Sequence, residues 1–227
     1  SKLLAAVRSY GIGGAMPYFE SFRRKRRDKR DYQKWIIHNS IDDQRWEEMR
    51  QEIKRFDSRP LISIILPVFD VDEIWLRKCI DSVIAQNYPK WELCIADDAS
   101  KRAYIRRVLD EYVSSDERIK AVFRPENGHI SAASNSALEI ASGEFSVLLD
   151  HDDELTEDAL FWVAKELNDH PETAMIYSDE DLIDEKGVRS DPKFKPDFSR
   201  DLMYSLNVVT HLSAYRTELL RKVGGFR

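Results

Sequence analysis

From residue 61 onward, the hydrophobic positions alternate between short apolar runs and stretches in which apolar residues recur at helical spacing. Residues 61–68 (LISIILPV) are nearly all apolar and rich in β-branched side chains, which is typical of a strand buried on both faces of a parallel sheet. Similar short runs lie at residues 91–96, 119–123 and 145–149. This rhythm predicts an α/β fold with a doubly wound, mostly parallel sheet and right-handed crossovers.

Helices are predicted between and after these runs. Asp72 is the expected N-cap of a helix through residue 84, and Thr156 is the expected N-cap of another through residue 167. Two more helices are predicted around residues 104–113 and 131–141, the second ended by Gly143 as its C′ residue. After residue 174 the pattern changes to short strands and loops, with a turn at residues 184–187.

Residues 1–60 differ from the rest and are predicted to form an N-terminal helical and basic extension, followed by the α/β domain over residues 61–227. Residues 31–57 have the apolar spacing of a helix between charged positions. Three glycines and Pro17 argue against one long helix over residues 1–30. The extension carries 15 Lys or Arg against 9 Asp or Glu, whereas residues 61–227 have a net charge of −12. This asymmetry indicates different partners for the two parts.

The basic run from Arg23 to Arg30 has two interpretations. Clustered Lys and Arg gain on the order of 1 kcal/mol per charge near an anionic leaflet, so the run can dock on a membrane surface. Alternatively, it belongs to a solvated helical arm. A nucleic-acid partner is not predicted, because the run lacks interleaved aromatic residues and the remainder of the chain is acidic.

The composition excludes several other classes of protein. The chain has 227 residues, of which 42% are hydrophobic, so it is long and apolar enough to bury a core. No window approaches the roughly 18 uninterrupted apolar residues of a membrane span. Two cysteines make no disulfide scaffold, and no signal-peptide pattern is present. A cytoplasmic location is predicted. If the basic extension docks on a membrane, the protein would lie peripherally at its inner face.

Acidic residues follow the predicted strands. The first strand leads to Asp70, the second to Asp97 and Asp98, and the fourth to the segment Asp150-His151-Asp152-Asp153. Open parallel sheets bind ligands at the carboxyl ends of their strands, where these groups converge. Because neighbouring carboxylates resist joint ionisation, the arrangement predicts a cation or a ligand rich in N–H groups.

The spacing of Asp150 and Asp152 favours a metal ion. Side chains two apart on an extended segment point the same way, and a ligand set of oxygens alone suits Mg²⁺ or Mn²⁺. The alternative is that these aspartates cap the next helix or line a solvated turn. The sequence contains no G-x-x-x-x-G-K-[ST], G-x-G-x-x-G, H-E-x-x-H or paired C-x-x-C motif, which argues against phosphate-loop and zinc chemistry.

Six blocks, in this order, resemble one known family. The chain resembles the family 2 glycosyltransferases of the GT-A fold, of the type that builds bacterial surface polysaccharides, over about residues 61–227. The blocks are SIILPVF (63–69), SVIAQ (82–86), ADDAS (96–100), NGHISAASN (127–135), LDHDD (149–153) and GGFR (224–227).

This resemblance implies roles for individual residues. Asp98 would accept the imide N–H of a uracil or thymine base, with Asp97 in the same pocket. Asp150 and Asp152 match the family's D-x-D element, whose Mg²⁺ or Mn²⁺ stabilises the leaving diphosphate. His211 matches a position near the acceptor, and a structural histidine is the alternative. The donor-binding set also includes the backbone of the first strand's end, at Pro67, Val68 and Asp70.

The implied activity is an inverting, metal-dependent transfer of a sugar from a nucleoside diphosphate, UDP or dTDP favoured, to a growing cell-surface glycan or lipid-linked acceptor. The alternative is a non-catalytic module of the same fold that binds nucleotide sugars or glycans. The family's general base follows the GGFR block, so we expect the chain to be truncated at its C-terminus and to lack this base. Asp179, Glu180 and Asp181 are the weaker candidates for that role.

Overall fold

The computed structural model describes residues 16–227, and it describes side chains from residue 27 onward. Contacts divide the chain into two compact units. One unit combines the described residues up to Asp42 with Asp179–Pro196, and the other combines Asp43–Ser178 with Asp197–Arg227. The domain boundary that the sequence predicts at residues 60 and 61 stays a prediction.

The smaller unit consists of helix α2 (Met16–His38) and a hairpin of β6 (Glu180–Ile183) and β7 (Arg189–Lys193). On α2, Tyr32 stacks on Trp35 with ring centroids 5.6 Å apart, and Phe194 meets the Trp35 ring edge-on at 6.3 Å. Pro17 does not interrupt α2, contrary to expectation, and the three glycines lie outside the described residues. Pro17 lies in the first turn of α2, where its missing N–H has no intrahelical partner to lose.

The helical pattern of residues 31–57 is divided between two helices, the end of α2 and α3 (Asp43–Arg55). At the end of α2, the carbonyl of Trp35 accepts from both the backbone N–H of Asn39 at 2.9 Å and its side-chain amide at 2.8 Å. Helix α3 belongs to the larger unit and buries Met49 and Ile53 there.

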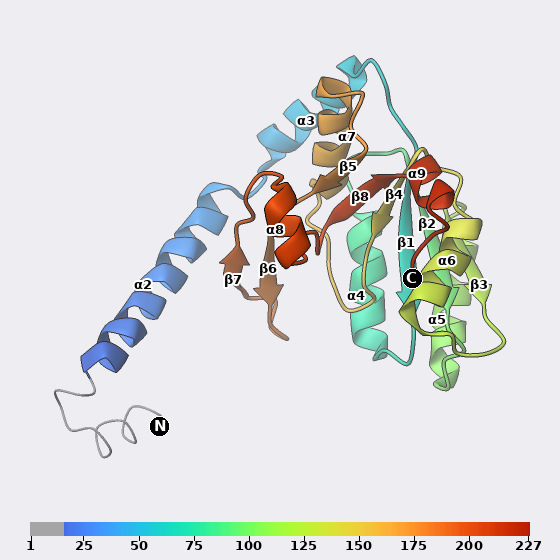
Figure 1. The fold of residues 1–227 in the computed structure, drawn as a ribbon, viewed down its shortest axis with the longest axis horizontal. Helices are drawn as coiled ribbons and strands as arrows, with labels where there is room; N and C mark the ends of the chain where they lie inside the picture. The colour runs from blue at the N-terminus through green and yellow to red at the C-terminus, as the bar shows by residue number, and fades with distance from the viewer. Residues whose placement is uncertain (1–15) are drawn as a thin grey trace. The chain divides into compact units, whose positions relative to one another are not determined.

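The larger unit is built on a six-stranded sheet with the order β3-β2-β1-β4-β8-β5 (Figure 1). Among these strands only β8 runs opposite to the other five, so the predicted mostly parallel sheet is confirmed. The strands are β1 (Ile62–Val68), β2 (Trp91–Asp97), β3 (Ile119–Phe123), β4 (Phe145–Leu148), β5 (Met175–Tyr177) and β8 (Ser213–Arg216).

Six helices of the larger unit follow α3 in the chain. They are α4 (Glu73–Ile84), α5 (Ala103–Ser115), α6 (His129–Glu139), α7 (Ala159–Asp169), α8 (Arg200–Ser205) and α9 (Thr217–Lys222). Asp72 does occupy the N-cap position of α4, although its side chain makes no capping hydrogen bond. The cap predicted at Thr156 is wrong, since α7 begins at Ala159 after Asp158.

Gly143 serves a purpose other than the predicted C′ position. Helix α6 ends at Glu139 with Ile140 as its C-cap, three residues before this glycine. A Cβ atom on Gly143 would lie 2.6 Å from the carbonyl oxygen of Leu61 and from the hydroxyl of Ser63. The glycine is therefore required for close approach of the chain to β1.

Every residue of β1 and β2 is buried, as expected for strands covered on both faces. On one face, Ile65 and Cys94 pack against Ala133 and Ala137 of α6. The small side chains of α6 allow the helix to approach the sheet closely. Within the described part of the chain, no helix combines the length and apolar character needed to cross a membrane.

Candidate active site

The strand order reverses between β1 and β4. The chain passes from β1 to β2 and β3 on one side, and it then returns to place β4 on the other side of β1. In open α/β sheets, ligands bind outside the carboxyl ends of the strands at such a switch point. The segments that leave these two strands here are residues 69–72 and residues 149–153.

Unusual backbone conformations gather at the same edge. Asp70 after β1, Ala99 after β2 and His129 at the start of α6 have positive φ angles of 44°, 60° and 64°. Non-glycine residues with such angles cost energy and are retained where the surrounding structure fixes them, often at functional sites. The strain marks this edge of the sheet as a candidate site.

Asp70 organises the loops that follow β1 and β2. Its N–H donates to the hydroxyl of Ser100 at 3.0 Å, and its Oδ1 accepts from the N–H groups of Lys101 at 2.7 Å and Arg102 at 3.2 Å. The carboxylate therefore holds the β2–α5 loop against the β1–α4 loop. Sequence reasoning assigned Asp70 to a ligand, and the structure gives it this supporting contact.

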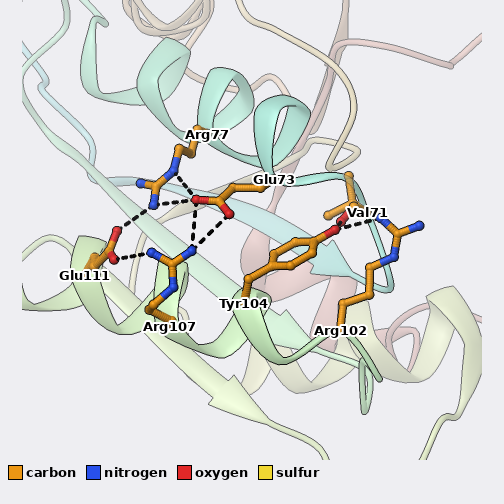
Figure 2. Close-up of polar contacts among 7 residues, drawn as sticks. All are labelled: Val71, Glu73, Arg77, Arg102, Tyr104, Arg107 and Glu111. Atoms are coloured by element: carbon orange, nitrogen blue, oxygen red, sulfur yellow. Dashed lines mark hydrogen bonds and ion pairs between the residues drawn. The ribbon is translucent and has the colours of Figure 1, made fainter.

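The β1–α4 loop is braced a second time by the start of α5, as Figure 2 shows. The hydroxyl of Tyr104 donates to the carbonyl of Val71 at 2.9 Å, and Arg102 donates to that hydroxyl at 2.7 Å. Arg102 also pairs with Asp72. Sequence reasoning did not identify Arg102 or Tyr104. The feature that could have identified them is their position, two and four residues after the ADDAS block.

Helices α4 and α5 are joined next to this loop by four alternating charges (Figure 2). Arg77 reaches Glu111 at 2.6 Å and Glu73 at 2.9 Å, while Arg107 reaches Glu73 and Glu111 at 3.0 Å. These groups are partly exposed, so each pair contributes modestly to stability. Their effect is to fix the first turn of α4 relative to α5.

Asp98 and Asp97 are both buried at the end of β2, with Asp98 only 2% exposed. The carboxylate of Asp98 accepts from Arg124 Nε at 2.7 Å and from the N–H of Gly128 at 3.0 and 3.1 Å. Asp97 accepts from the N–H of Ser100 at 3.4 Å. Sequence reasoning did not identify Arg124, although a basic residue directly after a predicted strand was a visible signal.

The extended conformation predicted for Asp150–Asp152 is wrong. The N–H of Asp153 donates to the carbonyl of Asp150 at 3.1 Å, which closes a turn. His151 Nδ1 lies 3.2 Å from the carbonyl of Pro67, so this side chain links β4 to β1 across the switch point. The sequence pattern assumed a strand continuing past Leu148, whereas the chain turns there to reach α7.

The turn brings a second acidic residue and a distant histidine together. His211 Nδ1 lies 3.2 Å from Asp153, and His211 Nε2 lies 3.7 Å from Asp150. One potential ligand atom from each of the three residues lies within 4.8 Å of the others. The two carboxylates are ligands of the kind that Mn²⁺ and Mg²⁺ prefer, whereas the imidazole is more typical of a transition metal, and the residues are exposed enough to admit an ion. Asp152 is exposed and lies outside this group.

Cys79 lies beneath the acidic turn without taking part in it. Its thiol donates to the carbonyl of Asp150 at 3.4 Å. Burial raises the pKa of Cys79 well above its usual value, and the neighbouring carboxylates, led by Asp153, raise it further. Cys79 is therefore a protonated packing residue that supports the turn.

Asp179, Glu180 and Asp181 belong to the smaller unit, and each carboxylate has partners there. Asp181 accepts from Tyr32 at 2.5 Å and from Arg189 at 2.7 Å. Glu180 binds Lys193 at 2.7 Å and Lys195 at 3.2 Å, and Asp179 accepts from the N–H of Lys195 at 2.7 Å. These contacts give the three residues a structural role within their own unit.

Comparison with known proteins gives consistent matches. Residues 63–224 match the family described as glycosyl transferase family 2. The O-antigen biosynthesis protein RfbC of Myxococcus xanthus is 37% identical over 87% of this chain, which spans 15% of that protein.

Two solved structures share the fold. S. aureus TarS in complex with UDP-GlcNAc matches 73% of this chain and 48% of its own, with a TM-score of 0.59 and 24% identity. A mannosyltransferase from Pyrobaculum calidifontis in complex with GDP-Man and Mn²⁺ matches 80% of this chain and 55% of its own, with a TM-score of 0.57 and 22% identity.

Proposed function

The chain belongs to glycosyl transferase family 2, and from that premise we propose that it transfers a sugar from a nucleoside diphosphate to a growing cell-surface glycan with inversion. The relative from Myxococcus xanthus, named for O-antigen biosynthesis, supports the glycan as product. The TarS structure with UDP-GlcNAc supports a UDP sugar as donor, with a dTDP sugar as the alternative that the resemblance implies.

The observation that carries this proposal is the convergence of acidic strand ends at the switch point of the sheet. We propose that Asp98 accepts an N–H of the base, with Asp97 and the backbone of residues 67–70 lining the same pocket. Asp98 is buried at the end of β2, where a hydrogen bond to a base would be shielded from water. His211 lies in the same unit and is proposed to face the acceptor as well as the ion.

We propose that Mn²⁺ or Mg²⁺ is held by Asp150, Asp153 and His211, with Asp152 as the further carboxylate that the D-x-D pattern predicts. The mutual distances of the first three residues support this set. A bound ion would stabilise the charge on the leaving diphosphate. In this proposal, Asp150, Asp153 and His211 hold the ion next to the base pocket.

No general base is assigned among Asp179, Glu180 and Asp181, because their carboxylates are engaged with Tyr32, lysines and Arg189. A base beyond the GGFR block stays a prediction. Removing the acceptor proton requires a carboxylate within hydrogen-bond reach of the hydroxyl.

Titration calorimetry with UDP tests the proposed function. We expect UDP to bind much more tightly with Mn²⁺ than with a chelator, and UDP-sugar to be hydrolysed or transferred in a longer chain that continues past Arg227. Absence of UDP binding under both conditions would refute the donor site. UDP binding without turnover in the longer chain would instead favour a non-catalytic nucleotide-sugar module.

We also propose that α2 contacts the anionic inner face of a membrane. Arg27, Lys29 and Arg30 are exposed on this helix, and the side chains of the earlier basic residues, from Arg23, lie outside the described part. Co-sedimentation with vesicles should rise with anionic lipid content and collapse with added salt. Replacing these three residues with glutamine should weaken it, and salt-independent binding would refute the contact.

A further inference from the structure

We infer that Arg124 is a positioning residue that determines base specificity by holding Asp98 in one orientation. The inference rests on the proposed nucleotide site. It concerns a residue that makes no contact with the base in this scheme and acts through the carboxylate of Asp98.

Arg124 connects the end of β2 to α6. Its Nε donates to Asp98 Oδ1 at 2.7 Å, and one terminal nitrogen donates to the hydroxyl of Ser136 at 2.7 Å and to the carbonyl of Ala132 at 3.3 Å. The Asp98 side chain is 3% exposed and that of Arg124 is 21% exposed. The planar guanidinium is therefore fixed by partners on two elements and cannot rotate freely about Asp98.

Gly128 makes room for this arrangement. A Cβ atom at this position would lie 2.6 Å from a terminal nitrogen of Arg124 and 2.7 Å from the Cβ of Ala132. The N–H of Gly128 also donates to the Asp98 carboxylate, so the glycine supplies both space and a second donor. The glycine at the second position of the NGHISAASN block is therefore required for the contact between Arg124 and Asp98.

The contacts use the two oxygens of Asp98 unequally. Oδ1 accepts from Arg124 and Gly128, while in the described part of the chain Oδ2 receives only the shared N–H of Gly128, at 3.1 Å. An ionised carboxylate can only accept hydrogen bonds, and Oδ2 has capacity left for one more donor. Asp98 held in this way suits a base that presents a ring N–H.

This chemistry separates the nucleobases into two groups. Uracil, thymine and guanine carry a hydrogen on the ring nitrogen of their pairing edge, whereas cytosine and adenine carry a lone pair there. A lone pair facing Oδ2 leaves a buried acceptor unsatisfied, and sites built for a hydrogen bond reject such analogues strongly. A fixed Asp98 therefore rejects cytosine, and a mobile Asp98 does not.

Calorimetry with UDP and CDP in the presence of Mn²⁺ tests the inference. We expect the wild-type chain to prefer UDP by about tenfold or more, a typical value for one charged hydrogen bond. Arg124→Met should reduce this ratio toward one, and Arg124→Lys should restore part of it. Arg106→Met is the matched control, because Arg106 lies over the ring of Phe123 on β3 and makes no contact with Asp98.

The outcomes separate this inference from the proposed function. Failure of the wild-type chain to bind either nucleotide refutes the nucleotide site itself. Equal wild-type binding of UDP and CDP, or an unchanged ratio in Arg124→Met with both affinities reduced alike, refutes specificity through Arg124. If Arg124→Met does not fold, Ser136→Ala is measured instead, because it removes one hydrogen bond that fixes the guanidinium. A lower ratio of UDP to CDP affinity in this variant supports the inference, and an unchanged ratio refutes it.

Discussion

The two edges of the parallel sheet both carry acidic residues, in opposite surroundings. At the amino edge, Glu92 is buried and its carboxylate accepts from Ser63 at 2.6 Å, from the N–H groups of Ser142 at 2.5 Å and Gly143 at 3.0 Å, and from Lys120 at 2.6 Å. At the carboxyl edge, Asp150 and Asp153 are partly exposed and share His211.

The difference separates a structural carboxylate from the carboxylates that we propose bind an ion. A buried charge is stable when donors surround it, and Glu92 has them from β1, from β3 and from the residues before β4. Asp150 and Asp153 instead lie near solvent beside one imidazole, where an ion can reach them. Residue type alone does not distinguish Glu92 from Asp150 and Asp153, whereas the number and burial of their donors does.

The largest effect is expected at the amino edge. Glu92→Ala should lower the free energy of unfolding by about 3–5 kcal/mol, because the buried N–H groups of Ser142 and Gly143 lose their acceptor. Urea unfolding measures this change. Glu139→Ala, at an exposed position on α6, is the control and should change stability by no more than about 0.5 kcal/mol. A loss below about 1 kcal/mol for Glu92→Ala would contradict the structural role.

The same carboxylate should make stability depend on pH. Burial raises the pKa of Glu92, but hydrogen bonds from Lys120, Ser63 and Ser142 outweigh it and lower the pKa from 4.5 to about 2. A depressed folded-state pKa stabilises the protein fully above pH 4.5, and this contribution is lost as the pH falls toward 2. Between pH 6 and 2, the wild-type chain should lose about 3 kcal/mol more unfolding free energy than Glu92→Gln. Equal losses would show that Glu92 is not the responsible group.

An intermediate effect is expected at Asp98, which shares properties of both edges. It is buried and hydrogen-bonded like Glu92 but lies at the carboxyl edge. Asp98→Ala should weaken UDP binding with Mn²⁺ by about 10-fold to 100-fold, the effect of losing a buried charged hydrogen bond. Calorimetry on protein with an unchanged circular dichroism spectrum measures this loss. Equal binding by mutant and parent would exclude Asp98 from base recognition.

The smallest change in stability is expected at the acidic turn. Asp150→Asn should alter the free energy of unfolding by less than about 0.5 kcal/mol, yet remove most of the difference in UDP affinity between Mn²⁺ and a chelator. The same measurement on Asp152→Asn and Asp153→Asn shows which of these two carboxylates contributes more to the effect of Mn²⁺ on UDP affinity. If Asp150→Asn keeps the full response to Mn²⁺, the proposed ion site is wrong.

The strands could be predicted because their signal is local. A run such as residues 61–68 is apolar and rich in β-branched side chains, which is typical of a buried strand, and β1 matches it to within one residue. Helix starts were less predictable. The N-cap of α7 is Asp158 rather than Thr156, since tertiary contacts select among neighbouring capping residues.

The sequence by itself determined the order of strands and helices from β1 to α7 and the acidic residues that follow three of the strands. It also carried the six blocks that resemble the family. These are properties of short segments, and apolar periodicity and motif spacing express them directly. The sheet topology then brings the acidic segments to one edge, because parallel strands share a direction.

Only the tertiary structure decided which side chains meet. Arg124 contacts Asp98, which lies 26 residues earlier in the chain. His211 lies beside Asp150, although the two residues are far apart in the sequence. The turn that pairs Asp150 with Asp153 depends on how the chain leaves β4 for α7. Such contacts follow from packing between distant elements, and no local pattern in the sequence encodes the distance between them.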